Sequence, residues 1–336
     1  MKKLLYIGNN LSHSGKTQTT IETLSKSLRQ EGYEVFTYSN KSNKVLRLFD
    51  MLFAILKHSK TIDYVLIDTY STSNFYYAFL SSLFCHFLNL KYIPILHGGN
   101  LPNRLKTNPR LSKVIFCKSF KNIAPSNYIK YEFEKLGYNN IDSIPNSIEI
   151  EKYPFKEKDF KTVRLLWVRS FSELYNPLLA VQILKDLQKE KIEASLCMVG
   201  PDNDGSLERT KDYAKKLNVK VKFTGKLSKP DWIKLSNDYN IFINTTNFDN
   251  MPVSVIEAMA LGLPIISTNV GGLPFLIENG AEGVLVAPNN PAEFVMAIKN
   301  LQSNTENTRQ MVFKARNKVN NFDWQIVKNL WIRVLE

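Results

Sequence analysis

The stretch from residue 241 to 272 constrains the fold of this chain more than any other part of it. Ile241–Asn244 is a short apolar run that predicts a buried strand, and a polar loop follows it. Pro252 stands where a proline in the first turn of a helix costs no hydrogen bond, and Gly262 ends that helix. Residues 264–268 predict the next buried strand. This order of strand, loop, helix and strand is typical of α/β folds, which bind ligands at the carboxyl ends of their parallel strands.

The amino end of the predicted helix is suited to binding a phosphate. It lies near Met251 and Val253, where amides without intrahelical acceptors and the helix dipole favour an anion. Glu257 follows about one helical turn later, so its carboxylate can accept hydrogen bonds from the hydroxyls of a sugar. The stretch therefore predicts a site for a ligand that carries both groups.

The same stretch resembles the donor-binding signature of the retaining family-four glycosyltransferases, which have the GT-B fold. That signature has two glutamates separated by seven residues, an Ala-Met-Ala-x-Gly-x-Pro run and a Gly-Gly turn. Glu257 matches the second glutamate, AMALGLP and VGG match in place, and Asp249 stands at the first glutamate position. The resemblance implies that Glu257 holds the ribose of a nucleotide sugar and that Asp249 faces the transferred sugar. It implies a donor-binding loop and helix start made of Asn250, Met251, Pro252 and Val253.

The length of 336 residues predicts two domains. The resemblance implies two Rossmann-like, doubly wound domains that face each other across a cleft, an acceptor-side domain over 1–150 and a nucleotide-sugar domain over 151–322. A stripe of Trp324, Val327, Trp331 and neighbouring apolar residues predicts a terminal helix over 323–336. In GT-B proteins the final helix returns to the first domain, and this stripe fits that arrangement, although an ordinary core helix has the same pattern.

The polar run GNNLSHSGKT follows the first predicted strand. A P-loop needs a glycine where Asn10 stands, so the run does not match that motif. Ser14, Gly15 and Lys16 occupy the position of the family's Gly-Gly turn between the first strand and helix, which implies that Gly15 and Lys16 lie near the donor. Lys16 could add a charge to the diphosphate, or its side chain could point to solvent.

His97 follows the predicted strand 92–96 and precedes two glycines, which let a ligand approach its imidazole closely. Members of the family similarly have a histidine here that faces the donor sugar. The resemblance therefore implies that His97 and Asp249 are the catalytic residues.

Arg169 follows the strand that opens the second domain. In the family an arginine at this strand end, and a lysine about six residues later, grip the diphosphate of the donor. Arg169 matches the arginine, but the Lys-Gly position reads Tyr175-Asn176, so the lysine is missing. Asn176 is short and neutral, and it can offer the diphosphate at most a hydrogen bond.

The net charge of +13 is concentrated in the first half of the chain. Residues 1–150 carry 19 Lys and Arg against 10 Asp and Glu, and a predicted loop over 104–113 carries four cations and no acid. With an apolar helix near Phe75, this predicts an anionic membrane surface as a partner, which would make the protein peripheral on the inner leaflet.

The chain has no nucleic-acid-binding motif. Asn9-Asn10 cut short the apolar run at the start, so a cytoplasmic protein without a secretory signal is expected.

No metal or cofactor is expected. The three cysteines lack metal-ligand spacing, and Asp202-Asn203-Asp204 is expected to form a turn and a helix cap.

The resemblance implies a glycosyltransferase that moves a sugar from a UDP- or GDP-linked donor to a hydroxyl of a sugar or lipid-linked acceptor. The reaction would retain anomeric configuration and would serve the assembly of cell-surface polysaccharide or glycolipid. Two alternatives stay open: a non-catalytic nucleotide-sugar-binding subunit, and a nucleotide-sugar epimerase on the same fold. The expected lack of a signal peptide argues against a periplasmic sugar-binding protein.

Overall fold

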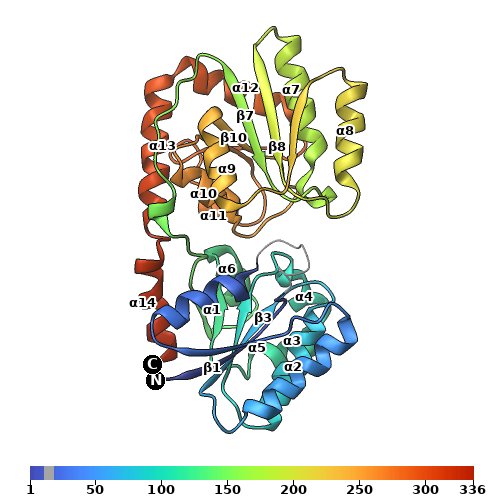
Figure 1. The fold of residues 1–336 in the computed structure, drawn as a ribbon, viewed down its shortest axis with the longest axis vertical. Coiled ribbons are helices and arrows are strands. Elements are labelled where there is room, and N and C mark those ends of the chain that lie inside the picture. The colour runs from blue at the N-terminus through green and yellow to red at the C-terminus, as the bar shows by residue number, and fades with distance from the viewer. Residues whose placement is uncertain (11–18) are drawn as a thin grey trace. The chain divides into compact units, whose positions relative to one another are not determined.

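A computed structural model of the chain describes residues 1–10 and 19–336. The chain forms two compact units, one made of residues 1–145 with 324–336 and the other of residues 146–323 (Figure 1). Each unit is built on a parallel sheet of six strands with helices on both faces, which confirms the predicted α/β fold class. The expected domain boundary at residue 150 falls inside the second unit, at the short 3₁₀ helix η2 (Ile150–Lys152).

The first sheet has the strand order β2-β1-β3-β4-β5-β6. Its strands are β1 (Lys3–Ile7), β2 (Glu34–Tyr38), β3 (Tyr64–Thr69), β4 (Tyr92–Leu96), β5 (Asn122–Ala124) and β6 (Ile141–Ser143). The helices of this unit are α1 (Thr20–Gln30), α2 (Lys44–His58), α3 (Phe75–Phe87), α4 (Leu101–Thr107), α5 (Pro109–Phe116), α6 (Asn127–Lys135) and α14 (Trp324–Leu335). The segment expected to be a loop over 104–113 is therefore helical for most of its length. Pro102 and Pro109 lie in the first turns of α4 and α5, where proline costs no helical hydrogen bond.

Two groups of helices cover the two faces of the first sheet. The helices from α2 to α6 pack on one face, and α1 with α14 packs on the other. The apolar stripe of α14 supplies Trp324, Val327 and Trp331 to the same core as Ile21 of α1 and Tyr6 of β1. The Trp324 indole donates a hydrogen bond to the Glu31 carboxylate at 3.0 Å, so α14 is held at the end of α1. Residues from both ends of the sequence therefore pack in one hydrophobic core.

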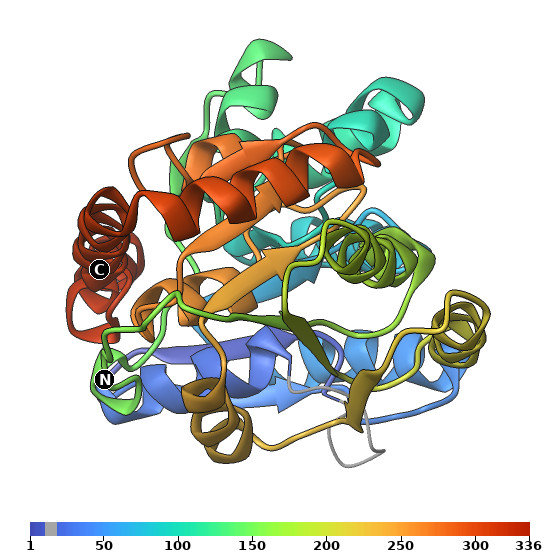
Figure 2. The ribbon, with the colours of Figure 1, turned by 90° about the horizontal axis from the view of Figure 1, so that it is seen from above.

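The second sheet has the strand order β12-β11-β10-β7-β8-β9. Its strands are β7 (Val163–Val168), β8 (Ala194–Val199), β9 (Val221–Gly225), β10 (Ile241–Asn244), β11 (Ile265–Thr268) and β12 (Val284–Val286). The helices are α7 (Pro177–Lys189), α8 (Ser206–Lys216), α9 (Lys229–Leu235), α10 (Val253–Ala260), α11 (Leu273–Leu276), α12 (Pro291–Ser303) and α13 (Thr305–Asn320), with 3₁₀ turns η3 (Glu173–Tyr175) and η4 (Ser236–Asp238). One face is covered by α7, α8 and α12, and the other by α9, α10 and α13 (Figure 2).

The organising stretch has the predicted order of strand, loop, helix and strand, as β10, a loop, α10 and β11. Pro252 is the residue that caps α10, with extended backbone angles, and does not lie inside its first turn. Because β10 is a central strand of the sheet, the loop after it lies beside the end of β7, which pairs with β10. The topology thus positions Arg169 near the start of α10. Among the helices that the structure describes, none is long and apolar enough to cross a membrane.

Candidate active site

The structure brings Arg169 and Asp249 together in the second unit. The guanidinium of Arg169, which follows β7, forms an ion pair with the carboxylate of Asp249, which lies in the loop after β10. The other carboxylate oxygen of Asp249 accepts a hydrogen bond from the Asn250 amide at 2.9 Å. Burial raises the pKa of the Asp249 carboxyl above its usual range, and the Arg169 charge acts in the opposite direction. This ion pair therefore holds a carboxylate in a place where its charge is poorly solvated.

Tyr175 is a site residue that the sequence did not reveal. The Arg169 guanidinium lies over the Tyr175 ring, 3.9 Å from Cζ to the ring centroid, and its Nε is buried without a hydrogen-bond partner in the described chain. Tyr175 stands where the family has its lysine. Asn176 has a left-handed backbone, with φ 45°, and donates from its side chain to the Asn289 side chain at 2.7 Å. The side chain of Asn176 is thus engaged with Asn289 and not with Arg169.

The two glycines after β11 pack directly on the loop that carries Asp249 and Asn250. The Gly272 amide donates to the Asp249 carbonyl oxygen at 2.9 Å. A Cβ atom on Gly271 would lie 2.1 Å from that oxygen, and one on Gly272 would lie 1.8 Å from the Asn250 carbonyl oxygen. Only glycine fits at these contacts. The turn therefore fixes the backbone of the loop before α10.

The amino end of α10 presents backbone amides at the end of this loop. The Pro252 carbonyl accepts hydrogen bonds from the amides of Val255 and Ile256, at 3.1 and 3.3 Å. The amides of Val253 and Ser254 come first in the helix and have no intrahelical acceptor. Met251 is buried, and its carbonyl accepts from the Asn146 side chain at 3.3 Å. The geometry at this end suits an anionic ligand.

Glu257 is almost fully buried, with 2% of its surface exposed. Its Oε1 accepts a hydrogen bond from the Tyr153 hydroxyl at 2.7 Å and is ion-paired with Lys229. Burial and the Glu257 charge raise the pKa of Tyr153, so the hydroxyl keeps its proton and donates. Both contacts fall on the same oxygen, and within the described residues Oε2 has no such contact. No local sequence pattern pointed to Tyr153 or Lys229, because they lie 104 and 28 residues from Glu257 along the chain.

His97 lies in the first unit, at the end of β4. Its Nε2 is 2.7 Å from Oδ1 of Asp68, at the end of β3, and the same oxygen accepts from the Tyr6 hydroxyl at 2.8 Å. Burial and the Asp68 charge raise the pKa of Tyr6 well above its usual value. Asp68 was not predicted, although an acidic residue in the otherwise apolar run YVLIDT is the signal that could have revealed it.

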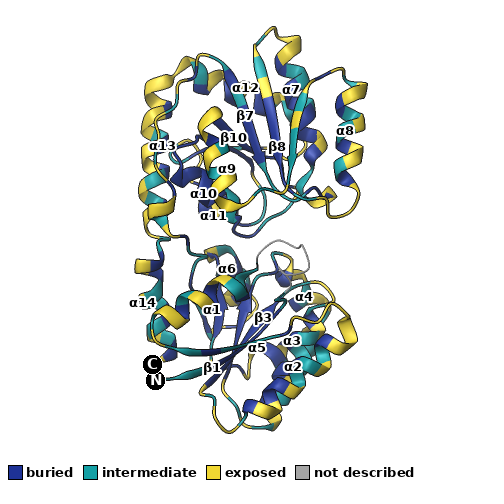
Figure 3. Cartoon of the chain, in the orientation of Figure 1, coloured by how far each residue is buried: buried dark blue, intermediate teal, exposed yellow. Residues whose placement is uncertain are grey.

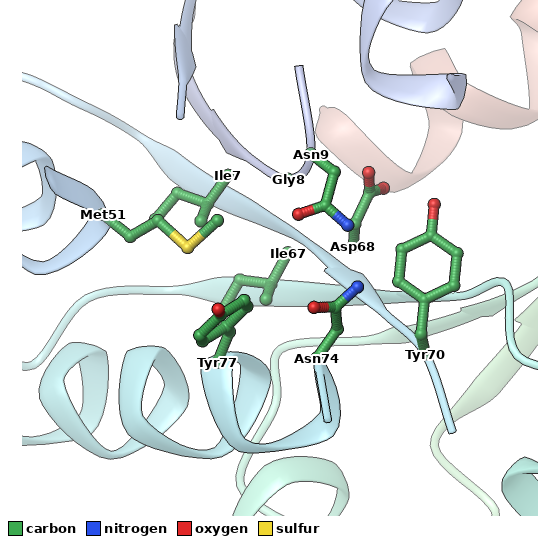
Figure 4. A pocket seen from close by; sticks show the side chains of 9 residues that line it. All are labelled: Ile7, Gly8, Asn9, Met51, Ile67, Asp68, Tyr70, Asn74 and Tyr77. Atoms are coloured by element: carbon green, nitrogen blue, oxygen red, sulfur yellow. The ribbon is translucent and has the colours of Figure 1, made fainter. Parts of the chain in front are cut away.

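Asp68 also faces a pocket at the ends of β1 and β3. Asn9, Tyr70 and Asn74 are among the residues that line it (Figure 4). The second carboxylate oxygen, Oδ2, is buried and has no hydrogen-bond partner in the part of the chain that the structure describes. A Cβ atom on Gly8 would lie 2.3 Å from Oδ2, so glycine is required there. The pocket thus contains a buried acceptor for a hydrogen-bond donor.

Gly15 and Lys16 lie outside the described residues. Over residues 1–10 and 19–336 no group of three or more His, Cys, Asp or Glu side chains could hold a metal ion. In the run 202–204, Asp202 accepts from the Gly205 amide at 3.1 Å, and Asp204 accepts from the Ser206 amide at 3.2 Å. These aspartates form a turn at the start of α8.

Comparison with known proteins adds to this geometry. The model of the family described as "Glycosyl transferases group 1" matches residues 149–318. An uncharacterized glycosyltransferase of Haemophilus influenzae is 26% identical, over 94% of this chain and 95% of its own length. Spore coat protein SA of Bacillus subtilis is 28% identical, but the match covers 51% of this chain and only 48% of that protein. The solved structure of Anabaena HepE in complex with UDP and glucose has a TM-score of 0.81 at 17% identity, over 100% of this chain and 99% of that one.

Proposed function

Because this chain belongs to the family of glycosyl transferases group 1, we propose that it moves a sugar from a nucleotide-sugar donor to an acceptor hydroxyl. The chain has the GT-B fold. One observation carries the proposal: Arg169 lies beside the loop that leads into α10, and Glu257 lies one turn further along that helix. A cation, a helix amino end and a buried carboxylate are what a diphosphate and its ribose require.

The donor binds to the second unit in this proposal. Arg169 and the amides at the start of α10, near Met251 and Val253, bind the diphosphate, and Glu257 binds the ribose through its free Oε2. As the glycosidic bond breaks, negative charge develops on the leaving diphosphate. The same groups then stabilise the transition state more than the ground state. The proposed donor set also includes Asn250 and Pro252 in the loop, Asn176 beside Tyr175, and Gly15 with Lys16.

His97 and Asp249 are the residues that we assign to the transferred sugar. The support for His97 is its place at the end of β4 before two glycines, together with its contact to Asp68. The support for Asp249 is its match to the signature and its buried charge. HepE binds UDP and glucose, which supports a UDP-linked hexose as the donor of this chain. We propose that the reaction retains anomeric configuration and needs no metal.

The acceptor proposed here is a sugar or a lipid-linked sugar in the assembly of cell-surface polysaccharide or glycolipid. We place the protein in the cytoplasm, at the surface of an anionic membrane where such an acceptor would be found. The support is electrostatic: residues 69–131 contain eight Lys and Arg and no Asp or Glu. A segment with this excess of positive charge is attracted to anionic lipid, and salt weakens the attraction.

Two measurements test the function. Thermal unfolding with UDP, GDP, ADP or CMP identifies the nucleotide, because a ligand that binds only the folded state raises its stability. Incubation with sugars linked to that nucleotide, with and without lipid-linked acceptors, then tests transfer. Nucleotide release coupled to a new glycoside supports the proposal. Binding without any turnover indicates the non-catalytic subunit, and a changed sugar nucleotide without acceptor indicates the epimerase.

A further inference from the structure

Helix α2 exposes an apolar face that no described residue covers. Its exposed apolar side chains are Val45, Leu46, Phe49, Phe53 and Leu56, each between 53% and 63% exposed. At 3.6 residues per turn, these five positions fall within a sector of about 100°. The opposite side of the helix supplies Met51, Ala54 and Ile55 to the core of the first unit. An ordinary surface helix is polar on its outer side. Helix α2 differs, because it has apolar side chains on both its inner and its outer side.

Helix α3 extends this face. Tyr76, Leu83 and Phe87 lie on one side of α3, and Phe87 is 81% exposed. The two helices pack together, and the Tyr77 hydroxyl of α3 donates to the Lys44 carbonyl of α2 at 3.0 Å. We define the α2–α3 face as Val45, Leu46, Phe49, Phe53, Leu56, Tyr76, Leu83 and Phe87. These are eight of the eighteen exposed large apolar residues in the described chain, and the other ten lie in other parts of it. Figure 3 shows exposed residues in yellow along α2.

Lysines and arginines lie at both ends of α2 and on α4 and α5, and one acid, Asp50, lies on α2 beside the α2–α3 face. Lys41 and Lys44 lie at the start of α2, and Lys57 and Lys60 lie at its end. Lys106, Arg110 and Lys113 lie on α4 and α5, and α5 packs against α3. All seven are exposed, and none forms an ion pair with a carboxylate of the described residues. An apolar centre with flanking unpaired cations is complementary to an anionic lipid surface.

We propose that the α2–α3 face is the surface by which this protein lies on an anionic bilayer. The aromatic and aliphatic side chains insert at the boundary between headgroups and acyl chains, and the flanking cations contact lipid phosphates. This inference rests on the proposed location and names the surface responsible. A second copy of the chain is disfavoured as the occupant, because a symmetric dimer would bring the flanking cations of both copies together.

The test uses the full chain and vesicles of two compositions, phosphatidylcholine alone and phosphatidylcholine with one third phosphatidylglycerol. Sedimentation measures partitioning of the wild type, the double variant Phe49→Ser/Phe53→Ser, and the matched control Met296→Ser/Phe313→Ser, which removes two exposed apolar side chains from the second unit. We expect the α2 variant to bind the anionic vesicles at least about tenfold more weakly, because two large apolar side chains no longer insert. The control should bind as the wild type does. Binding of the control and of the wild type should weaken as the salt concentration rises.

Calorimetry with UDP separates this inference from the proposed function, and the α2 variant should bind UDP as the wild type does. If the wild type binds anionic vesicles and the α2 variant binds them equally, the surface is wrong while the proposed location stands. If the wild type binds neither vesicle, the inference fails with the location, whatever UDP affinity is measured. A wild-type dimer in sedimentation velocity that becomes monomeric in the α2 variant, without vesicle binding, would instead make the face an interface between copies.

Discussion

The imidazole of His97 lies 2.7 Å from the carboxylate of Asp68, and the two side chains are only 8% and 1% exposed. A carboxylate can only accept hydrogen bonds, so Nε2 of His97 carries the proton of this contact. Nδ1 is then the nitrogen available to a ligand. The Tyr6 hydroxyl of β1 also donates to Asp68, so the carboxylate is held in place from the strand on the other side of β3 from His97. We infer that Asp68 positions the ring of His97 and selects its tautomer.

Asp68→Asn tests this role. The amide keeps the size of the side chain but removes the charge and offers the imidazole either a donor or an acceptor. We expect kcat to fall roughly tenfold or more, because the variant loses a charge-assisted hydrogen bond to the imidazole. UDP affinity should be unchanged. Tyr6→Phe removes only one neutral donor and should lower kcat less. In a double-mutant cycle with His97→Ala, the losses should not add, because both act through the same ring. Additive losses would show that Asp68 acts independently of His97.

Arg169→Lys keeps the charge of the guanidinium but loses its planar fork and its stacking on Tyr175. We expect UDP binding to weaken by roughly tenfold or more, because lysine cannot copy bidentate contact to a diphosphate. Tyr175→Phe is the matched control, since it keeps the ring under the cation and should leave UDP affinity nearly unchanged. Calorimetry with UDP measures all three proteins. Wild-type affinity in Arg169→Lys would remove Arg169 from the donor site.

Asp249→Asn should separate donor binding from turnover. In the structure Asp249 occupies the guanidinium of Arg169, so a bound diphosphate must compete with this carboxylate. Removing the charge frees Arg169, and we expect UDP to bind as tightly as in the wild type or more tightly. Turnover should fall, because Asp249 is the residue assigned to the transferred sugar. Weaker UDP binding with unchanged kcat would contradict both parts of this assignment.

Glu257→Gln tests recognition of the ribose. A charge-assisted hydrogen bond contributes about 1.5–3 kcal/mol, so the variant should lose roughly tenfold or more in UDP affinity. The sharper comparison uses 2′,3′-dideoxy-UDP, which lacks both ribose hydroxyls. The wild type should prefer UDP to this analogue, and the variant should discriminate far less. Tyr153→Phe removes the neutral donor to Oε1 but leaves the carboxylate, so it should keep the preference. Equal discrimination by Glu257→Gln would place the ribose elsewhere.

Lys158 gives a pH dependence to stability. Burial, with the nearby charges of Lys156 and Arg164, lowers the pKa of Lys158 to about 8. The unfolded chain holds this proton to a pKa of about 10.4, so between these values the unfolded state binds more protons. The free energy of unfolding therefore rises with pH through this window. Urea unfolding of the wild type and Lys158→Met at pH 7 and 9.5 should show a stability difference that moves in favour of the wild type at the higher pH. The same difference at both values would refute the shift.

Local sequence patterns predicted the elements around the site better than its contacts. The apolar run Ile241–Asn244 and the glycine at 262 gave the strand and the end of the helix correctly, because apolar runs and glycine act through the local backbone. The contact between Tyr153 and Glu257 joins positions 104 residues apart, and no periodicity reports such a pairing. Tyr175 was missed for another reason. The family pattern predicts a positive charge at that position, whereas the structure has an aromatic ring under Arg169.

The place of α14 in the core of the first unit has a consequence for the order of synthesis. Trp324, Val327 and Trp331 are translated only after the whole of the second unit, residues 146–323. Until then the apolar side chains of Tyr6 and Ile21 lack the helix that covers them in the finished molecule. The unit that starts first on the ribosome is therefore completed last, and for as long as the second unit is being made its nascent form exposes to chaperones and to other chains the part of one sheet face that α1 does not cover.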